Sequence, residues 1–214
     1  MKTKHSFDTV HGSQEVFRIL LEALSNPGRI MDLGSREDQF AARGRWLALA
    51  LTLLDNETGF FWDGDAETGE EIRFLTGAAA LPPAEADFVF LPAPAEGPPG
   101  PAGVEAARFL SQVKQGTHID PHNSAILFIA ANERYAAENN GDEKNNGEKP
   151  GEALYLTGPG IPPQGRRIDL SPAEAAWRRA RDERGFEYPC GVELVFLRED
   201  RSLLALTRKT MIGP

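Results

Sequence analysis

The sequence predicts one mixed α/β domain. Apolar segments of strand length alternate with amphipathic helical segments along all 214 residues, an order typical of α/β folds. Of these residues, 41% are hydrophobic, which is enough to fill one core. The last two apolar segments, 191–198 and 203–208, are separated by a short polar turn and therefore predict a hairpin. Because a hairpin pairs its strands antiparallel, we expect a mixed sheet of about seven strands.

Five segments have helical patterns. In the first, apolar residues recur at i, i+3, i+4 and i+7, which predicts one buried face that consists of Phe17, Leu20, Leu21 and Leu24. In residues 45–55, leucine occurs at every second position, as it would in a strand. The segment is not enriched in the β-branched and aromatic residues of strands, so we interpret it as a buried helix. The predicted helices are 13–26, 45–55, 70–77, 104–115 and 171–184.

Seven segments are predicted as strands. Residues 124–131 are apolar after Ser124, which is typical of a central strand buried on both faces. Residues 132–152 are rich in asparagine and charge and predict a mobile loop. Since strands flank this loop, we interpret it as the tip of a hairpin inside a single domain, 1–214. The predicted strands are 29–32, 60–62, 87–91, 124–131, 153–157, 191–198 and 203–208.

The charge balance excludes several classes of partner. Thirty-two Asp and Glu against 23 Lys and Arg give a formal charge of −9, which disfavours binding to a nucleic-acid backbone or an anionic membrane. The longest apolar run, 46–54, is far shorter than the roughly 20 residues that span a bilayer. The first residues lack the apolar core of a secretion signal, so we expect a cytoplasmic protein. One cysteine excludes an intrachain disulfide and a Cys-rich metal site.

Two groups of residues have side chains suited to metal binding or nucleophilic chemistry. His118, Asp120 and His122 alternate along the chain, and imidazole with carboxylate suits zinc or iron. Pro121 interrupts this segment and a fourth ligand is missing, so a solvated loop is the better interpretation. Cys190 begins an apolar strand, where a small packed thiol is commoner than a nucleophile.

Two further motifs have residues suited to anions. One is a group of four arginines on a predicted helix, which could bind a phosphate or a carboxylate: Arg178, Arg179, Arg181 and Arg184. The commoner arrangement is a solvated helix face with intrahelical ion pairs. Binding to an acidic partner subunit is a further interpretation. The glycine turn 157–160 could bring backbone N–H groups against a phosphate or another chain. It fits neither the Walker A nor the dinucleotide motif, and no catalytic motif occurs in the sequence. We therefore expect no catalytic, metal or cofactor site in this chain alone.

In chain order, six blocks resemble one family, the H subunit (PhnH) of the carbon–phosphorus lyase system, with which bacteria degrade alkylphosphonates. The resemblance covers nearly the whole chain. Thr207 and Lys209 replace a proline and a threonine of the family pattern, and Glu193 replaces an aspartate. The blocks are Phe17-Arg18-x-Leu20-Leu21 with Ser25-x-Pro27-Gly28, Leu51–Thr58, Gly116-Thr117 with Pro121, Leu156–Ile161, Tyr188–Leu194 and Leu204–Thr210.

The resemblance implies a three-layer α/β/α domain, similar to the large domain of pyridoxal-phosphate-dependent transferases but without the cofactor site. The lysines agree with that absence, because a Schiff base needs a lysine on a rigid element. Among the six lysines, only Lys209 lies beside a predicted strand, and it replaces a family threonine. We expect no cofactor.

The resemblance also implies partners and a role. The family works with the G, I and J subunits in a complex that transfers the ribose triphosphate moiety of ATP to an alkylphosphonate, so a non-catalytic structural subunit is expected. The alternative is a stand-alone phosphate or phosphonate binder, or a transferase, that uses the glycine turn at 158–160. A homodimer is expected when the chain is alone. The blocks imply these candidate structural or interface residues: Pro27, Gly28, Asp55, Gly158, Gly160, Gly191 and Arg208.

Overall fold

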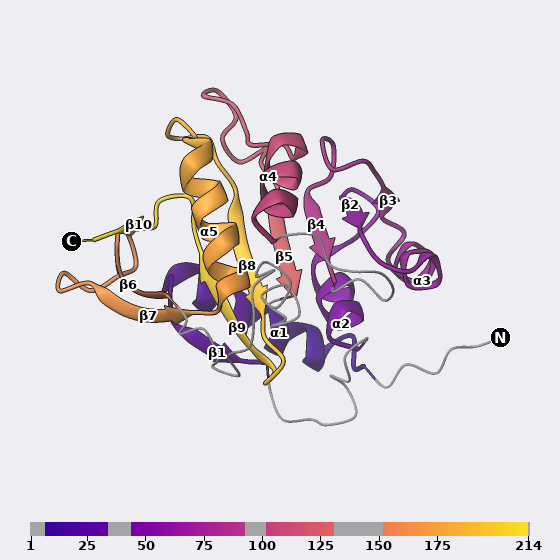
Figure 1. Ribbon diagram of the computed structural model, residues 1–214. Helices are drawn as coiled ribbons and strands as arrows, with labels where there is room; N and C mark the ends of the chain where they lie inside the picture. Colours follow the sequence, from indigo (N-terminus) through magenta and orange to yellow (C-terminus); the bar gives the residue numbers. More distant parts are fainter. Residues whose placement is uncertain (1–6, 34–43, 93–101, 131–151, 214) are drawn as a thin grey trace, which may run out of the picture.

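The computed structural model describes residues 7–33, 44–92, 102–130 and 152–213 (Figure 1). The helices in these ranges are α1 (His11–Ser25), α2 (Gly44–Leu53), α3 (Ala66–Thr76), α4 (Ala102–Gln112) and α5 (Pro172–Arg184). The strands there are β1 (Ile30–Asp32), β2 (Gly59–Trp62), β3 (Ala79–Ala80), β4 (Phe88–Leu91), β5 (Ile126–Ala130), β6 (Glu152–Thr157), β7 (Arg166–Leu170), β8 (Glu193–Leu197), β9 (Ser202–Leu206) and β10 (Met211–Ile212).

A mixed sheet of seven strands forms, as predicted, in the order β1-β9-β8-β5-β4-β2-β3. The unpredicted strand β3 belongs to it, and the predicted strand 153–157 does not. Within this order, the five neighbouring strands β8, β5, β4, β2 and β3 are parallel to one another. Strand β9 pairs antiparallel with β8 and with β1. The predicted hairpin of β8 and β9 is confirmed, as is the central position of β5. An all-apolar strand fits the centre because neighbours cover its edges and helices cover its faces.

The hairpin predicted across residues 132–152 is wrong. Both edges of β5 are occupied by the parallel neighbours β4 and β8, so it has no free edge for β6. Instead, β6 joins β7 and β10 in a separate antiparallel sheet. Along most of β6, residues that are exposed to solvent alternate with residues that are partly or fully buried. This alternation suits a sheet that is covered on one face only. Residues 132–151 of the predicted loop lie outside the described ranges, and Glu152 is the first residue of β6.

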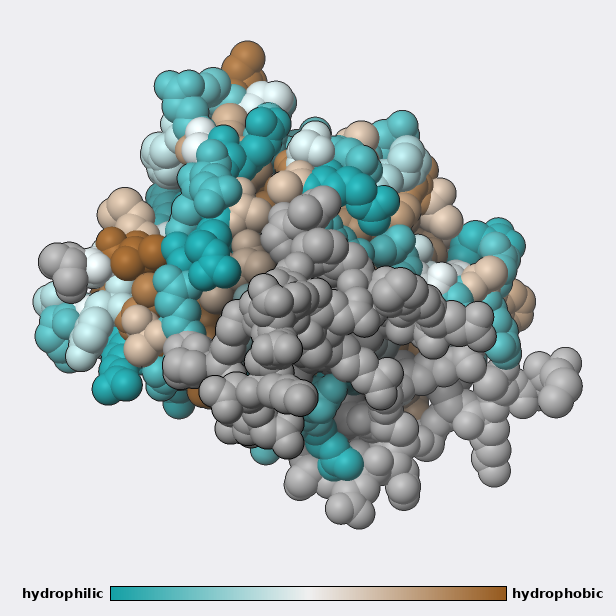
Figure 2. Space-filling view, in the orientation of Figure 1, coloured by the Kyte–Doolittle hydropathy of each residue, from teal (hydrophilic) through white to brown (hydrophobic). Residues whose placement is uncertain are grey.

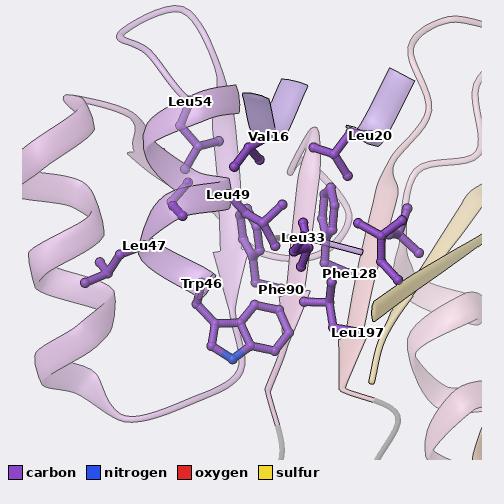
Figure 3. Packing of buried hydrophobic residues seen from close by; sticks show 14 of the residues in the cluster. Val16, Leu20, Leu33, Trp46, Leu47, Leu49, Leu54, Phe90, Phe128 and Leu197 are labelled. Atoms are coloured by element: carbon purple, nitrogen blue, oxygen red, sulfur yellow. The ribbon is translucent and has the colours of Figure 1, made fainter. Parts of the chain in front are cut away.

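Helices cover both faces of the large sheet, so the domain has three layers, as expected (Figure 1). On one face, α1 and α2 pack on Phe90 and Phe128, which point away from the side covered by α4 and α5. In Figure 3, Trp46 lies beside Phe90, and their ring centroids are 6.3 Å apart. Because successive side chains of a strand point to opposite faces of the sheet, the same strands contribute to a hydrophobic core on each face.

The buried face of α1 differs from the predicted one. Phe17 and Leu21 are 51% and 54% exposed, whereas Val16, Leu20 and Ala23 are buried. The helix carries two overlapping apolar stripes, and contacts with α2 and β9 decide which one enters the core. The second stripe is left at the surface.

The small sheet has one open face. Tyr155 on β6 and Met211 on β10 are mostly exposed there, and Figure 2 shows apolar side chains gathered over these two strands. An antiparallel sheet tolerates water on one face. In the described ranges, no helix has the length and apolar character needed to cross a membrane.

Asp87, directly before β4, ties three elements together. Its Oδ2 accepts a hydrogen bond from the Gly59 N–H at 2.7 Å, and its Oδ1 accepts one from Lys114 Nζ at 2.5 Å. Its carbonyl accepts from the Ile126 N–H. Burial raises the pKa of the Asp87 carboxyl, but the bonds from Lys114 and Gly59 outweigh burial and leave this pKa below its ordinary value.

Asp87→Asn is expected to lower the free energy of unfolding at neutral pH by about 1 kcal/mol, since the carboxylate is partly exposed. A group whose pKa is lowered by folding adds stability above its unfolded pKa, and this stability is lost as pH falls through the folded pKa. The deficit should therefore shrink below about pH 4. Urea denaturation of both proteins at neutral and acid pH measures it. An equal deficit at both would contradict this account.

Candidate functional site

Six of the seven candidate residues from the family blocks gather at one place, which we call the glycine–arginine junction. It consists of residues 25–28, 156–160, 189–193 and 207–210, and it lies at the amino ends of the parallel strands β5 and β8. The seventh, Asp55, lies elsewhere, in the turn between α2 and β2. There its side chain accepts a hydrogen bond from the Glu57 N–H at 2.9 Å. The six residues are Pro27, Gly28, Gly158, Gly160, Gly191 and Arg208.

Glycine is required where the segments touch. Gly160 has a φ of +77°, and a Cβ there would overlap with the carbonyl oxygen of Ser25 at the end of α1. Gly158 has a φ of +132°, and a Cβ there would lie 2.6 Å from the carbonyl oxygen of Lys209. Both backbone conformations favour glycine, and both positions leave no space for a side chain. The glycine turn is therefore a packing contact between α1 and the 207–210 turn.

Arg208 joins the segments of the junction. Its Nε and its backbone N–H both donate to the carboxylate of Glu193, each at 2.7 Å. Nη2 donates to the Ser124 hydroxyl, and Nη1 donates to the carbonyls of Pro121 and Pro189. Each guanidinium nitrogen thus has a partner within the chain. Arg208 ties its own turn, 207–210, to two other segments, 121–124 and 189–193.

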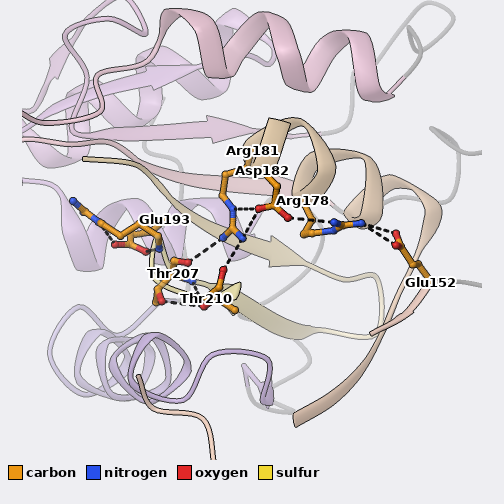
Figure 4. A network of polar contacts seen from close by, with 8 residues as sticks. Glu152, Arg178, Arg181, Asp182, Glu193, Thr207 and Thr210 are labelled. Atoms are coloured by element: carbon orange, nitrogen blue, oxygen red, sulfur yellow. Dashed lines mark hydrogen bonds and ion pairs between the residues drawn. The ribbon is translucent and has the colours of Figure 1, made fainter. Parts of the chain in front are cut away.

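The solvated face predicted for the arginines of α5 holds for Arg179 and Arg184, which are exposed, and is wrong for Arg178 and Arg181. Arg178 and Arg181 are buried, with side chains 8% and 6% exposed. Arg181 donates to the carbonyls of Thr207 and Thr210 and so fixes the turn after β9 (Figure 4). Arg178 donates two bonds to Glu152, both at 2.9 Å. Both arginines also bond to Asp182 on the same helix, but their other partners lie 26 or more residues away in sequence, so a helical pattern could not reveal those.

A hollow of about 460 Å³ opens at the junction. Its lining combines the Arg208–Glu193 pair with Lys209, whose Nζ lies 4.6 Å from the ring centroid of Tyr188. A cation over an aromatic ring is attracted by the electrons of its face. The other lining residues are Leu24, Ser25, Pro121, His122, Pro159, Gly160, Pro189 and Thr207.

The structure places the histidine cluster in an exposed turn and leaves the cysteine partly accessible. His118, Asp120 and His122 are exposed, and the Asp120 N–H donates to the Thr117 hydroxyl, so this segment is a turn and not an extended ligand row. No group of three potential metal ligands is assembled within the described ranges. Cys190 is half-buried.

A second, smaller hollow lies at the carboxyl ends of β2, β4 and β5, the usual place for ligands in α/β folds. Asp63 and Glu105 line it together with Phe109 and Trp177. Burial raises the pKa of the Asp63 carboxyl. Burial, and after it the charge of Asp63, raises the pKa of the Glu105 carboxyl. Each carboxylate is therefore less favourable in the folded chain than in water.

Glu105→Gln is expected to raise the melting temperature at neutral pH by about 1–3 °C, a value reduced for partial exposure. A carboxyl whose pKa is raised by folding contributes stability below its unfolded pKa, and this contribution is lost as pH rises through the folded pKa. The gain should thus vanish below about pH 4. Thermal scans of Glu105→Gln and of the exposed control Glu85→Gln test this. Equal shifts in the two variants would contradict it.

The junction residue Glu193 was missed as a candidate from sequence alone, and Arg181, which lies on α5, was predicted for a different role. Glu193 was noted only as a departure from the family pattern, and Arg181 as part of a charged helix face. The predicted hairpin did not signal the Glu193–Arg208 pair, because the β8–β9 register, extended by one residue, sets Glu193 opposite Thr207. Nothing local signals the role of Arg181.

Comparison with models of known protein families identifies the family of this chain. A family model described as bacterial phosphonate metabolism protein (PhnH) matches residues 5–213. No curated protein matches closely enough to count as a relative. The matched range includes all four segments of the junction, and the resemblance drawn from the six sequence blocks is confirmed.

Proposed function

Because this chain belongs to the PhnH family of bacterial phosphonate metabolism proteins, we propose that it is a non-catalytic structural subunit of the carbon–phosphorus lyase core complex. In this role it assembles with the G, I and J subunits and is needed for the transfer of the ribose triphosphate moiety of ATP to an alkylphosphonate. We expect it to work in the cytoplasm, where ATP is made. Without partners, it pairs with a second copy of itself.

One observation carries this proposal: two arginines that fix the junction, Arg208 within it and Arg181 on α5, bond to groups inside the chain. Arg208 bonds to Glu193, Ser124 and two carbonyls, and Arg181 bonds to the carbonyls of Thr207 and Thr210. Catalytic groups need polar atoms that face a substrate. Charged groups that bond to other residues of the same chain stabilise its fold instead. Stabilising interactions of this kind are what a structural subunit needs.

The alternative is a stand-alone phosphate or phosphonate binder that uses the turn at 158–160 with Arg208. The surroundings of the turn disfavour it. Gly158 faces the carbonyl oxygen of Lys209, and Gly160 faces that of Ser25. Carbonyl oxygens carry partial negative charge and repel an anion, and Arg208 has no free nitrogen to offset them.

Co-expression with tagged G, I and J subunits tests the proposal. The chain should elute with them as one species in size-exclusion chromatography, and a mixture without the chain should lack the transfer activity. A chain that stays separate at low and at physiological salt would overturn it. Calorimetry of the isolated chain with methylphosphonate and with ATP tests the alternative, which a micromolar Kd, about −8 kcal/mol, would favour.

A further inference from the structure

The apolar stripe that α1 leaves at the surface is unusual for its position. Phe17 and Leu21 are each about half exposed, and Leu24, which is half-buried and also packs against the core, follows one turn later on the same side of the helix. Three large apolar side chains on one helix face normally enter a core or cover a partner.

The stripe runs into the hollow of the glycine–arginine junction. Leu24 is its last member and forms part of the wall of the hollow. Three prolines and the ring of Tyr188 make the remaining wall largely apolar. Stripe and hollow together form one continuous surface, which we call the α1 surface: Phe17, Leu21, Leu24, Tyr188 and Lys209, with the lining prolines.

Lys209 supplies the charge of this surface. The other two charged groups in the lining, Arg208 and Glu193, neutralise each other at 2.7 Å. Lys209 contacts the Tyr188 ring, and among the residues that the structure describes it has no carboxylate within ion-pair distance. A chain with a formal charge of −9 thus presents one unpaired cation in an apolar setting.

We propose that the α1 surface docks a segment of a partner subunit that inserts an apolar side chain into the hollow and sets a carboxylate against Lys209. The proposal rests on the proposed function and names the chemistry of the contact. A carboxylate matches the single positive charge of Lys209. A phosphate or phosphonate needs several donors around its oxygens, and the nitrogens of Arg208 are already engaged.

The test uses the full chain assembled with the other core subunits. Phe17→Ser and Lys209→Met should each weaken assembly at least tenfold, about 1.4 kcal/mol. The matched controls are Phe74→Ser, at a phenylalanine 86% exposed on α3, and Arg73→Met, at an exposed cation on the same helix. Both controls should assemble as the unchanged chain does. Melting temperatures of all four variants exclude misfolding as the cause.

The dependence of assembly on salt concentration distinguishes the charged contribution to the contact from the apolar one. Assembly of the unchanged chain should weaken as NaCl rises, because salt screens the Lys209–carboxylate pair. Assembly of Lys209→Met should depend clearly less on salt. Hydrogen exchange should slow at residues 17–25 and 207–210 when the complex forms.

The outcomes distinguish the two proposals. An unchanged chain that never assembles overturns the proposed function and this inference with it. Assembly that tolerates Phe17→Ser or Lys209→Met as well as it tolerates the controls overturns only the α1 surface. Micromolar binding of methylphosphonate or ATP by the isolated chain, lost in Lys209→Met, would assign the hollow to a small anion and also overturn it.

Discussion

Gly160→Ala is expected to lower the free energy of unfolding by about 3–5 kcal/mol. Two effects add. A φ of +77° strains a residue that has a Cβ, by roughly 1–2 kcal/mol. The Cβ would also overlap with the carbonyl oxygen of Ser25, which belongs to the last turn of α1 and cannot rotate away as a side chain could. The end of α1, and Pro27 after it, must therefore move.

Gly185→Ala separates these two effects. Gly185 ends α5 with a φ of +64°, but the nearest atom to a Cβ there, the carbonyl oxygen of Glu183, would be 3.9 Å away. This control should lose only the backbone contribution, about 1–2 kcal/mol. Urea denaturation of both variants gives the comparison. Equal losses would show that the contact of Gly160 with α1 is not tight.

In assembly assays, Gly160→Ala should reduce the amount of complex in proportion to the loss of folded chain. The junction lies beside the α1 surface, so a displaced α1 terminus also disturbs Leu24. A variant that is as stable as the unchanged chain and alters only the KM of the complex for a phosphonate would contradict a structural role for the turn.

Arg208→Met is expected to cost about 3–5 kcal/mol. The change removes donors from Glu193, Ser124 and the carbonyls of Pro121 and Pro189. Glu193, only 15% exposed, would then keep its charge with the Arg208 backbone N–H as its remaining hydrogen bond. A charge left unpaired in a poorly hydrated place costs far more than a broken surface pair.

A double-mutant cycle tests this account. Glu193→Gln removes the charge that Arg208→Met leaves unpaired, so the double variant should be less destabilised than the sum of the single variants by at least about 1 kcal/mol. Arg208→Lys keeps the charge but loses the fork of donors, and its stability should lie between those of the unchanged chain and Arg208→Met. Arg73→Met, which breaks an exposed pair with Glu70, should leave the free energy of unfolding nearly unchanged. Strict additivity in the cycle would contradict a coupled Arg208–Glu193 pair.

The candidate site was predictable where its signal is local. Glycines at 158 and 160 mark a sharp turn in any context, and the family blocks add Arg208 and Gly191. The sequence could not predict that these residues lie together at one junction, because the junction is formed by four segments that are far apart in the chain. Lys209, noted from sequence only as an unsuitable Schiff-base lysine, became the charged group of the α1 surface for the same reason.

The sequence by itself determined the helices and strands with strong local signals. Ser171 and Glu174 form a capping box at the start of α5, and the apolar run of β5 makes it a central strand. Only the tertiary structure decided which stripe of α1 is buried, that β6 leaves the large sheet, and that Arg178 and Arg181 turn inward. The physical reason is that periodicity reports which side chains share a face, whereas burial depends on the surface that packs against that face. That surface comes from residues far along the chain.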